Sequence, residues 1–237
     1  MSSITTKLAM KAISGGLRLP RTAKFEAAHQ HGRTLDEIKR LEINVVLDVG
    51  ANRGHYARHL RMLGYDGHIL SFEPDPGTFR HLQAAAEGDD RWVAVNAALG
   101  ASEGVMNLNV IQTEDGETTL SSFREHIGDL PTHVVSVAIS TVREALRVSR
   151  LPADQRVFLK MDTQGFDLEV FAGGEDVDAI ALIQSEVSVI PLYKGMPTYL
   201  KALETYQAAG FSLLDLFVVN RTGEGAVLEY DALLARR

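Results

Sequence analysis

The segment Val45-Val46-Leu47-Asp48-Val49-Gly50-Ala51-Asn52-Arg53-Gly54-His55-Tyr56 predicts a buried strand that turns through glycines into a helix. Residues 45–49 are apolar apart from Asp48, a composition typical of a strand covered on both faces of a sheet. A helix that begins directly after such a strand presents unpaired amide groups to a charged ligand. We therefore expect a ligand site at the carboxyl end of this strand.

The same alternation of short apolar runs and helical stretches continues along the chain. It predicts an α/β fold, in which a mostly parallel sheet carries helices on both faces. The expected strands are Val45–Val49, His68–Phe72, Trp92–Asn96, Val157–Met161, Leu182–Val187, Phe211–Val218 and Ala226–Leu233. The expected helices are Arg53–Leu63, Pro76–Glu87, Ser140–Ser149, Asp167–Gly173 and Met196–Ala209.

One region departs from this alternation. Between residues 104 and 139 the helical period is lost, and Val105–Val110 and Val134–Ile139 are expected to be two extra strands. They flank a polar loop, Thr113–Pro131, and we expect this insertion to lie over the carboxyl ends of the sheet strands.

The amino-acid composition limits which kinds of catalytic or metal site the chain can form. The 237 residues, 45% of them apolar, suffice for a globular core, and they include no cysteine. A disulfide framework, a thiolate zinc site, an iron–sulfur cluster and a cysteine nucleophile are therefore excluded, which leaves oxygen and imidazole ligands for any metal. No run approaches the ~18 apolar residues of a membrane span, and the first twenty residues lack the apolar core of a signal peptide. We expect a cytoplasmic location.

Charge is distributed unevenly along the chain. The net charge of -7 disfavours nucleic acid as a partner. Residues 1–24 nevertheless hold five basic residues and no acidic one: Lys7, Lys11, Arg18, Arg21 and Lys24. Apolar residues at helical spacing accompany them: Ile4, Leu8, Ala9, Ala12 and Ile13. This pattern indicates either an ordinary terminal arm or a basic amphipathic helix, which could touch an anionic membrane surface or cover a substrate cleft.

We accordingly divide the chain into an N-terminal helical arm, residues 1–40, and one domain, residues 41–237, with an insertion at about 104–139. An arm of this kind can also be exchanged between the protomers of a homodimer.

A second motif follows the second expected strand. Glu73 stands where an acidic side chain can accept hydrogen bonds from both hydroxyls of a ribose, and Pro74 stiffens the turn after it. After the third strand, Asn96-Ala97-Ala98 supplies small residues and a polar group where an adenine ring can lie flat. The ligand is therefore expected to resemble a nucleoside.

The first glycine turn separates two classes of nucleotide-binding protein. A dinucleotide site has Gly-x-Gly-x-x-Gly, whereas this chain has Gly50-Ala51-Asn52-Arg53-Gly54 with Asp48 ahead of it. The acidic residue disfavours a pyrophosphate and favours a cationic ligand such as S-adenosylmethionine, which carries an amino group and a sulfonium. A dinucleotide-dependent oxidoreductase is the less favoured alternative.

Five motifs in register carry a resemblance to a known family. They are Leu47-Asp48-Val49-Gly50-Ala51-Asn52-Arg53-Gly54, Ser71-Phe72-Glu73-Pro74, Asn96-Ala97-Ala98-Leu99-Gly100, Leu159-Lys160-Met161-Asp162-Thr163-Gln164-Gly165-Phe166-Asp167, and Gln184-Ser185-Glu186 with Leu192-Tyr193. Over about residues 44–220 the chain resembles the FkbM-type S-adenosylmethionine-dependent methyltransferases. The resemblance implies a class I methyltransferase fold, a seven-stranded sheet whose last strand is antiparallel. It also implies methyl transfer to a hydroxyl of a sugar, glycan, glycolipid or secondary metabolite.

The motifs and this resemblance together give the candidate cofactor-binding residues. They are Asp48, Gly50, Ala51, Asn52, Tyr56, Glu73, Pro74, Asn96, Ala97, Ser122 and Asp162.

Methyl transfer to an alcohol requires a group that removes the hydroxyl proton. Asp162 ends the fourth strand and Glu186 ends the fifth, so the two carboxylates are expected to project side by side above the sheet. Either one of them is the base, with a pKa raised by its neighbour, or both hold a divalent cation such as Mg²⁺. Lys160 is expected to pair with one of these carboxylates.

Histidines supply further candidates for the base. No histidine follows Asp162 within a few residues, so the imidazole has to come from the insertion or the first helix. His126 and His133 flank the polar loop, and His55 follows the glycine turn. Two other functions stay open, an N-methyltransferase and a non-catalytic nucleotide-binding module, although the intact acidic residues disfavour the second.

Overall fold

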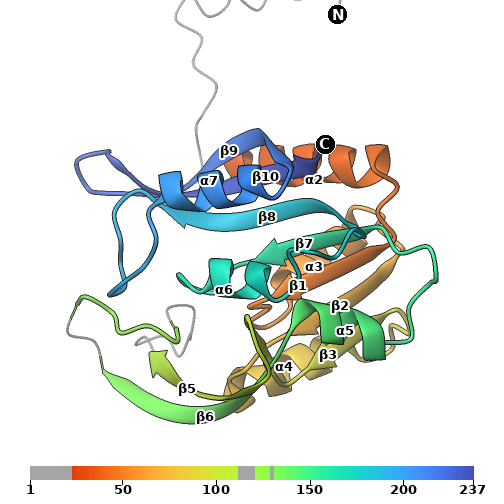
Figure 1. Cartoon of the computed structure of the whole chain (residues 1–237), viewed down its shortest axis with the longest axis horizontal. Helices are drawn as coiled ribbons and strands as arrows, with labels where there is room; N and C mark the ends of the chain where they lie inside the picture. Colours follow the sequence, from red (N-terminus) through yellow and green to blue (C-terminus); the bar gives the residue numbers. More distant parts are fainter. Residues whose placement is uncertain (1–22, 112–120, 129–130) are drawn as a thin grey trace, which may run out of the picture.

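The computed structural model describes residues 23–111, 121–128 and 131–237. A seven-stranded sheet with the order β3-β2-β1-β7-β8-β10-β9 forms its centre (Figure 1). The strands are β1 (Val45–Val49), β2 (His68–Phe72), β3 (Trp92–Val95), β7 (Val157–Met161), β8 (Ile180–Ser188), β9 (Phe211–Arg221) and β10 (Val227–Arg236). The last strand, β10, runs antiparallel to both of its neighbours, whereas β3, β2, β1, β7 and β8 pair in parallel. The predicted α/β architecture is confirmed.

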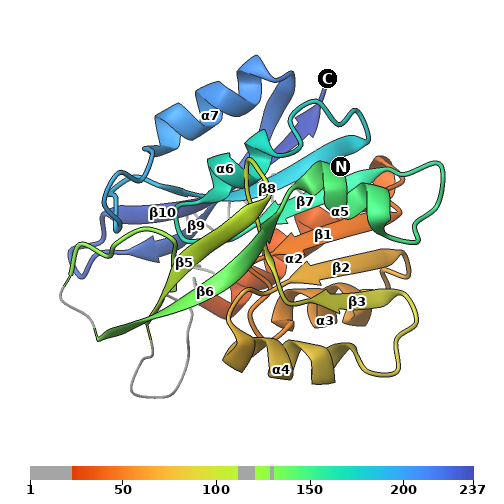
Figure 2. The same cartoon turned by 60° about the horizontal axis from the view of Figure 1, so that its bottom comes forward.

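Helices cover both faces of the sheet. They are α2 (Ala23–Arg40), α3 (His55–Met62), α4 (Pro76–Ala86), α5 (Val142–Val148), α6 (Asp167–Ala172) and α7 (Tyr199–Ala208). Alternation along β1 divides the core, because Leu47 packs with α5, α6 and α7 while Val46 packs with α2, α3 and α4. Figure 2 shows α5 and α6 in front of the sheet and α3 behind it.

The helix starts follow from local chemistry. Asp75 caps α4 by accepting a hydrogen bond from the amide of Thr78, and Pro76 occupies the first helical position. Thr141 and Thr198 cap α5 and α7 in the same way. These caps fix where each helix begins, and the parallel pairing of β3, β2, β1, β7 and β8 brings their carboxyl ends to one edge of the sheet.

The last two strands differ from the sequence prediction. We expected Phe211–Val218 and Ala226–Leu233, but β9 reaches Arg221 and β10 reaches Arg236. The two strands form an antiparallel hairpin in which β9 is the edge strand, so its pairing continues through the exposed Val219, Asn220 and Arg221. Strand β10 continues through Leu234 and Ala235, which are apolar and buried and which the predicted boundary left out.

The insertion forms a second, three-stranded sheet with the order β4-β6-β5. Its strands are β4 (Ala98–Leu99), β5 (Gly104–Ile111) and β6 (Thr132–Ser140). The two extra strands expected there are present as β5 and β6, which pair antiparallel. Much of the polar loop between them lies outside the described residues.

Helix α2 packs on the sheet. Its Ile38 belongs to the same core cluster as α3, and the Gln30 amide donates to Asp231 on β10 over 2.5 Å. The basic amphipathic segment expected before it falls on residues 1–22, which lie outside the described residues. Among the helices that the structure describes, none is long and apolar enough to cross a membrane.

Candidate active site

The glycine turn after β1 adopts a backbone that only glycine tolerates at its first position. Gly50 has a φ of 75°, and a Cβ there would lie 2.0 Å from the carbonyl oxygen of Asp162. The amides of Gly50 and Ala51 both donate to the carbonyl of Phe72, over 3.1 and 3.0 Å. The turn therefore lies against the ends of β2 and β7.

Glu73 closes this turn from β2. One carboxylate oxygen accepts a hydrogen bond from the backbone N–H of Asn52, and the other accepts from the backbone N–H of Asp75, each over 2.9 Å. Burial raises the pKa of Glu73 to about 7, although both amide hydrogen bonds oppose this shift. Because a carboxylate has about four acceptor positions, the side chain can still accept hydrogen bonds from a ligand.

Asn96, in the motif predicted to contact an adenine ring, forms hydrogen bonds to the protein backbone. The Asn96 amide donates to the carbonyls of Glu73 and Pro74, over 2.9 and 3.1 Å. Asn96 thus ties down the turn that carries Glu73, whereas Ala98 and Leu99 line the cavity in its place.

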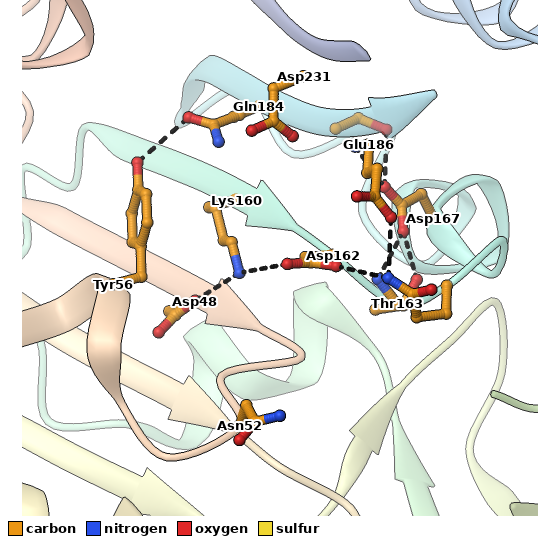
Figure 3. Close-up of polar contacts among 12 residues, drawn as sticks. Asp48, Asn52, Tyr56, Lys160, Asp162, Thr163, Asp167, Gln184, Glu186 and Asp231 are labelled. Atoms are coloured by element: carbon orange, nitrogen blue, oxygen red, sulfur yellow. Dashed lines mark hydrogen bonds and ion pairs between the residues drawn. The ribbon is translucent and has the colours of Figure 1, made fainter. Parts of the chain in front are cut away.

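Asp48 is fully buried beneath the site. The ammonium of Lys160 lies 3.2 Å from one of its oxygens, and the Ser71 hydroxyl donates to the other. Lys160 also lies 3.6 Å from Asp162, and Figure 3 marks both of these ion pairs with dashed lines. Burial lowers the pKa of Lys160, but the two facing carboxylates outweigh it and hold that pKa above its ordinary value. Asp48 therefore positions Lys160, which lines the cavity, and Asp48 itself is not among the lining residues.

The side-chain amide of Gln164 contacts Asp162 and Glu186, the two carboxylates predicted to act as a base or to hold a metal. Its NH₂ group donates to Asp162 over 3.2 Å and to Glu186 over 2.9 Å. The Tyr193 hydroxyl donates to the amide oxygen over 2.9 Å, which sets the NH₂ group toward the carboxylates. Gln164 itself has a φ of 53°, and the Ser122 hydroxyl holds its carbonyl. Residues far apart in the chain thus fix this amide.

Glu186 lies in an acidic environment. Burial raises its pKa well above the ordinary value, and Asp162, Glu229 and Asp231 raise it further. Asp167 positions its backbone by accepting from the Glu186 amide over 3.1 Å. By contrast, the Asp162 side chain is 41% exposed.

These groups surround one cavity of about 560 Å³. Nine predicted site residues line it: Gly50, Ala51, Asn52, Tyr56, Glu73, Pro74, Ser122, Asp162 and Glu186. Such a volume is typical of a small-molecule site, and the cavity lies where open α/β sheets bind ligands.

The comparisons with known proteins agree with this geometry. A family model described as the methyltransferase FkbM domain matches residues 48–213. The chain belongs to this family.

Solved structures share the fold of this FkbM methyltransferase at low identity. A putative O-methyltransferase from Klebsiella pneumoniae has a TM-score of 0.52 at 10% identity and covers 100% of this chain and 91% of its own. Precorrin-6y C5,15-methyltransferase from Geobacter metallireducens has a TM-score of 0.49 at 14% identity, covering 93% and 91%. Among curated proteins, none matches this sequence significantly.

The arrangement of donors in this FkbM methyltransferase does not fit the magnesium alternative. Within the described residues, no group of three or more histidine, aspartate or glutamate side chains is arranged to hold a metal ion. The Gln164 NH₂ group, a hydrogen-bond donor, lies between Asp162 and Glu186, where a cation would need acceptors.

The two insertion histidines lie away from the cavity. His126 accepts from the Gly128 amide and contacts the Tyr193 ring, while the exposed His133 pairs with Val110 in the β5–β6 hairpin. His55 does line the cavity. His31 and His59, which the sequence analysis did not consider, line it as well, with ring centroids 4.9 Å apart.

Further polar residues that were not predicted as site residues reach the cavity from α2, β8, β9 and β10. They are Gln30, Gln184, Asn220, Glu229 and Asp231. The one signal was periodicity: Glu229 and Asp231 are two residues apart on an expected strand, so they share a face.

Proposed function

We propose that this FkbM methyltransferase transfers the methyl group of S-adenosylmethionine to a hydroxyl of a small acceptor, a sugar, a lipid-linked glycan or a secondary metabolite. The observation that carries the proposal is that one cavity is lined both by the turn residues that suit a nucleoside and by Glu186, a half-buried carboxylate of raised pKa. The family match supports the reaction class, and the geometry supports the division of roles.

The nucleoside half of the cavity offers a group for each part of the methyl donor. Glu73 suits the ribose hydroxyls, and Ala98 and Leu99 supply apolar surface for the adenine. The half-exposed Asp162 suits the amino group, since Lys160 is already shared with Asp48. When bound, S-adenosylmethionine supplies a methyl group on a positively charged sulfur, which departs as a neutral thioether.

Glu186 is the proposed general base. Its raised pKa makes the carboxylate a better proton acceptor near neutral pH than an ordinary glutamate. As the acceptor oxygen bonds to the methyl carbon, its proton passes to Glu186. The Gln164 amide holds the carboxylate in place by donating to it.

Calorimetry with S-adenosylhomocysteine tests the donor half of this proposal. We expect binding to the wild type and at least a tenfold weaker affinity for Glu73→Ala, about 1.4 kcal/mol. Glu87→Ala, an exposed change at the end of α4, is the matched control and should bind normally. Absence of heat with the wild type, or unchanged affinity of Glu73→Ala, would refute the nucleoside subsite.

Labelled S-adenosylmethionine with a panel of hydroxylated acceptors tests the second half. Transfer should be strongly reduced in Glu186→Gln while S-adenosylhomocysteine binding persists. Transfer should also survive chelation of divalent cations. Loss of transfer on chelation, restored by Mg²⁺, would refute the assignment of Glu186 as a metal-free base.

A further inference from the structure

We propose that Glu229 and Asp231 form a subsite for a protonated amino group on the acceptor, separate from the hydroxyl that is methylated. This inference rests on the proposed function, because it names the class of acceptor for the same cavity. It assigns a role to two carboxylates, the buried Glu229 and the half-buried Asp231, that neither donor binding nor proton removal requires.

The two carboxylates occupy the acceptor end of the cavity. Glu229 and Asp231 are two residues apart on β10, so they share the sheet face that also carries Glu186. Asp231 is paired directly opposite Glu186 in the β8–β10 register, and Figure 3 shows the two beside each other. Only 2% of Glu229 is exposed to solvent.

The hydrogen bonds to these carboxylates come from neutral groups. The Ser188 hydroxyl and the Asn220 amide donate to the two oxygens of Glu229, over 3.2 and 2.8 Å. The Gln30 amide donates to one oxygen of Asp231. These contacts hold both side chains in fixed orientations and leave further acceptor positions on each.

No cationic side chain forms an ion pair with either carboxylate. Within the described part of the chain, no lysine, arginine or histidine lies within ion-pair distance of Glu229 or Asp231. Lys160 attracts Asp231 from farther away, but its ammonium is 3.2 Å from Asp48 and 3.6 Å from Asp162, which share its charge. Like charges directly opposite each other on neighbouring strands repel, and a buried charge without a counter-charge of its own is costly. The buried Glu229 and the half-buried Asp231 thus lie beside a third carboxylate, line a cavity and have no cation of their own.

An ammonium group matches these requirements. It brings one positive charge and three hydrogen-bond donors, which suit two carboxylates that already accept neutral donors. A neutral hydroxyl could occupy the same acceptor positions but would leave the repulsion in place. A bound metal is disfavoured because the described residues do not bring three ligands together.

The residues of this subsite belong to this chain rather than to the matched part of the family. Gln30, Asn220, Glu229 and Asp231 all lie outside residues 48–213, the range that the family model covers. Helix α2 and the β9–β10 hairpin therefore add an acceptor end to a common donor site.

Matched probes that differ only in the amino group test the inference. The binding of D-glucosamine, N-acetyl-D-glucosamine, cyclohexylamine and cyclohexanol is measured by calorimetry, with the protein saturated with S-adenosylhomocysteine. At pH 7 we expect each amine to bind at least tenfold more tightly than its neutral counterpart. Asp231→Asn should remove this preference, and Glu224→Gln, an exposed change in the β9–β10 turn, should preserve it.

Three results would overturn the inference: equal binding of amines and neutral probes, no binding of either amine, or a preference that persists in Asp231→Asn. Methylation of the amino nitrogen in a turnover assay would also overturn it, because the amine would then be the reacting group. The affinity for S-adenosylhomocysteine distinguishes failure of this inference from failure of the proposed function. If S-adenosylhomocysteine binds and the amines do not, only the amino-group subsite is refuted. If S-adenosylhomocysteine does not bind, the proposed function is refuted as well.

Discussion

Replacing Gln164 with leucine removes the amide that donates to Asp162 and Glu186 and leaves an apolar side chain of similar volume. The same backbone φ of 53° is required of both residues, so the substitution adds little new backbone strain. Its main effect is to withdraw a hydrogen bond of 2.9 Å from the ionised form of Glu186.

The size of the effect follows from the strength of that hydrogen bond. A bond to a charged group contributes roughly 1.5 kcal/mol, which corresponds to about one pKa unit. Because the amide favours the ionised carboxylate, its loss raises the pKa of Glu186, which burial and its acidic neighbours already place well above the ordinary value. The acidic limb of the pH–rate profile should therefore move upward by about one unit.

A direct assay does not require the acceptor. Protein labelled with ¹³C at the glutamate carboxyl carbon is titrated by NMR, and Glu186→Gln identifies the Glu186 resonance. Tyr193→Phe is the matched control, since it removes only the donor to the far side of the amide and should cause a smaller shift. An unchanged midpoint in Gln164→Leu, with the fold intact, would refute the role given to this amide.

Three further predictions concern stability. Gly50→Ala should cost more than about 2 kcal/mol in urea unfolding because its Cβ would meet a carbonyl oxygen, whereas Gly88→Ala, at a φ of 84° with open space around it, should cost about 1 kcal/mol. Lys160→Met should cost about 3–5 kcal/mol by leaving Asp48 buried without its cation, and adding Asp48→Asn should recover part of this loss. The pKa of Glu73, about 7, exceeds that of an unfolded glutamate, so the stability it confers is complete below about pH 4 and is lost as the pH rises through 7. Thermal unfolding of Glu73→Gln should show a smaller decline between pH 5 and 8; an identical decline in both proteins would contradict this assignment.

The inner half of the sheet was predictable because each strand is a continuous buried run. The strands β1, β2 and β7 have the predicted bounds, since apolar residues stop where the chain leaves the core. The glycine turn and Glu73 were predictable for a related reason: they lie within a few residues of those strand ends, so sequence spacing fixes their place.

The part of the cavity that is proposed to bind the acceptor could not be predicted from the spacing of residues along the sequence. The contact between Gln30 and Asp231 joins residues 201 positions apart, and no local pattern indicates it. His126 and His133 were placed near the cavity because they flank the polar loop, but the hairpin pairing of β5 and β6 and the contact with Tyr193 direct them elsewhere. The ion pair between Asp48 and Lys160 could not be predicted either, because Lys160 comes from a strand more than 100 residues later.

The position of β10 has a consequence for the two halves of the cavity. Strand β10 lies between β8 and β9, so the β9–β10 hairpin is joined to the rest of the sheet through the pairing of β10 with β8 alone. Glu73 and Asp162 follow strands on the other side of β8, which pair with one another in parallel, whereas Asp231 reaches the cavity from the hairpin. A change that loosens the pairing of β8 with β10 would therefore displace Asp231 and leave the pairing of β1, β2 and β7 intact.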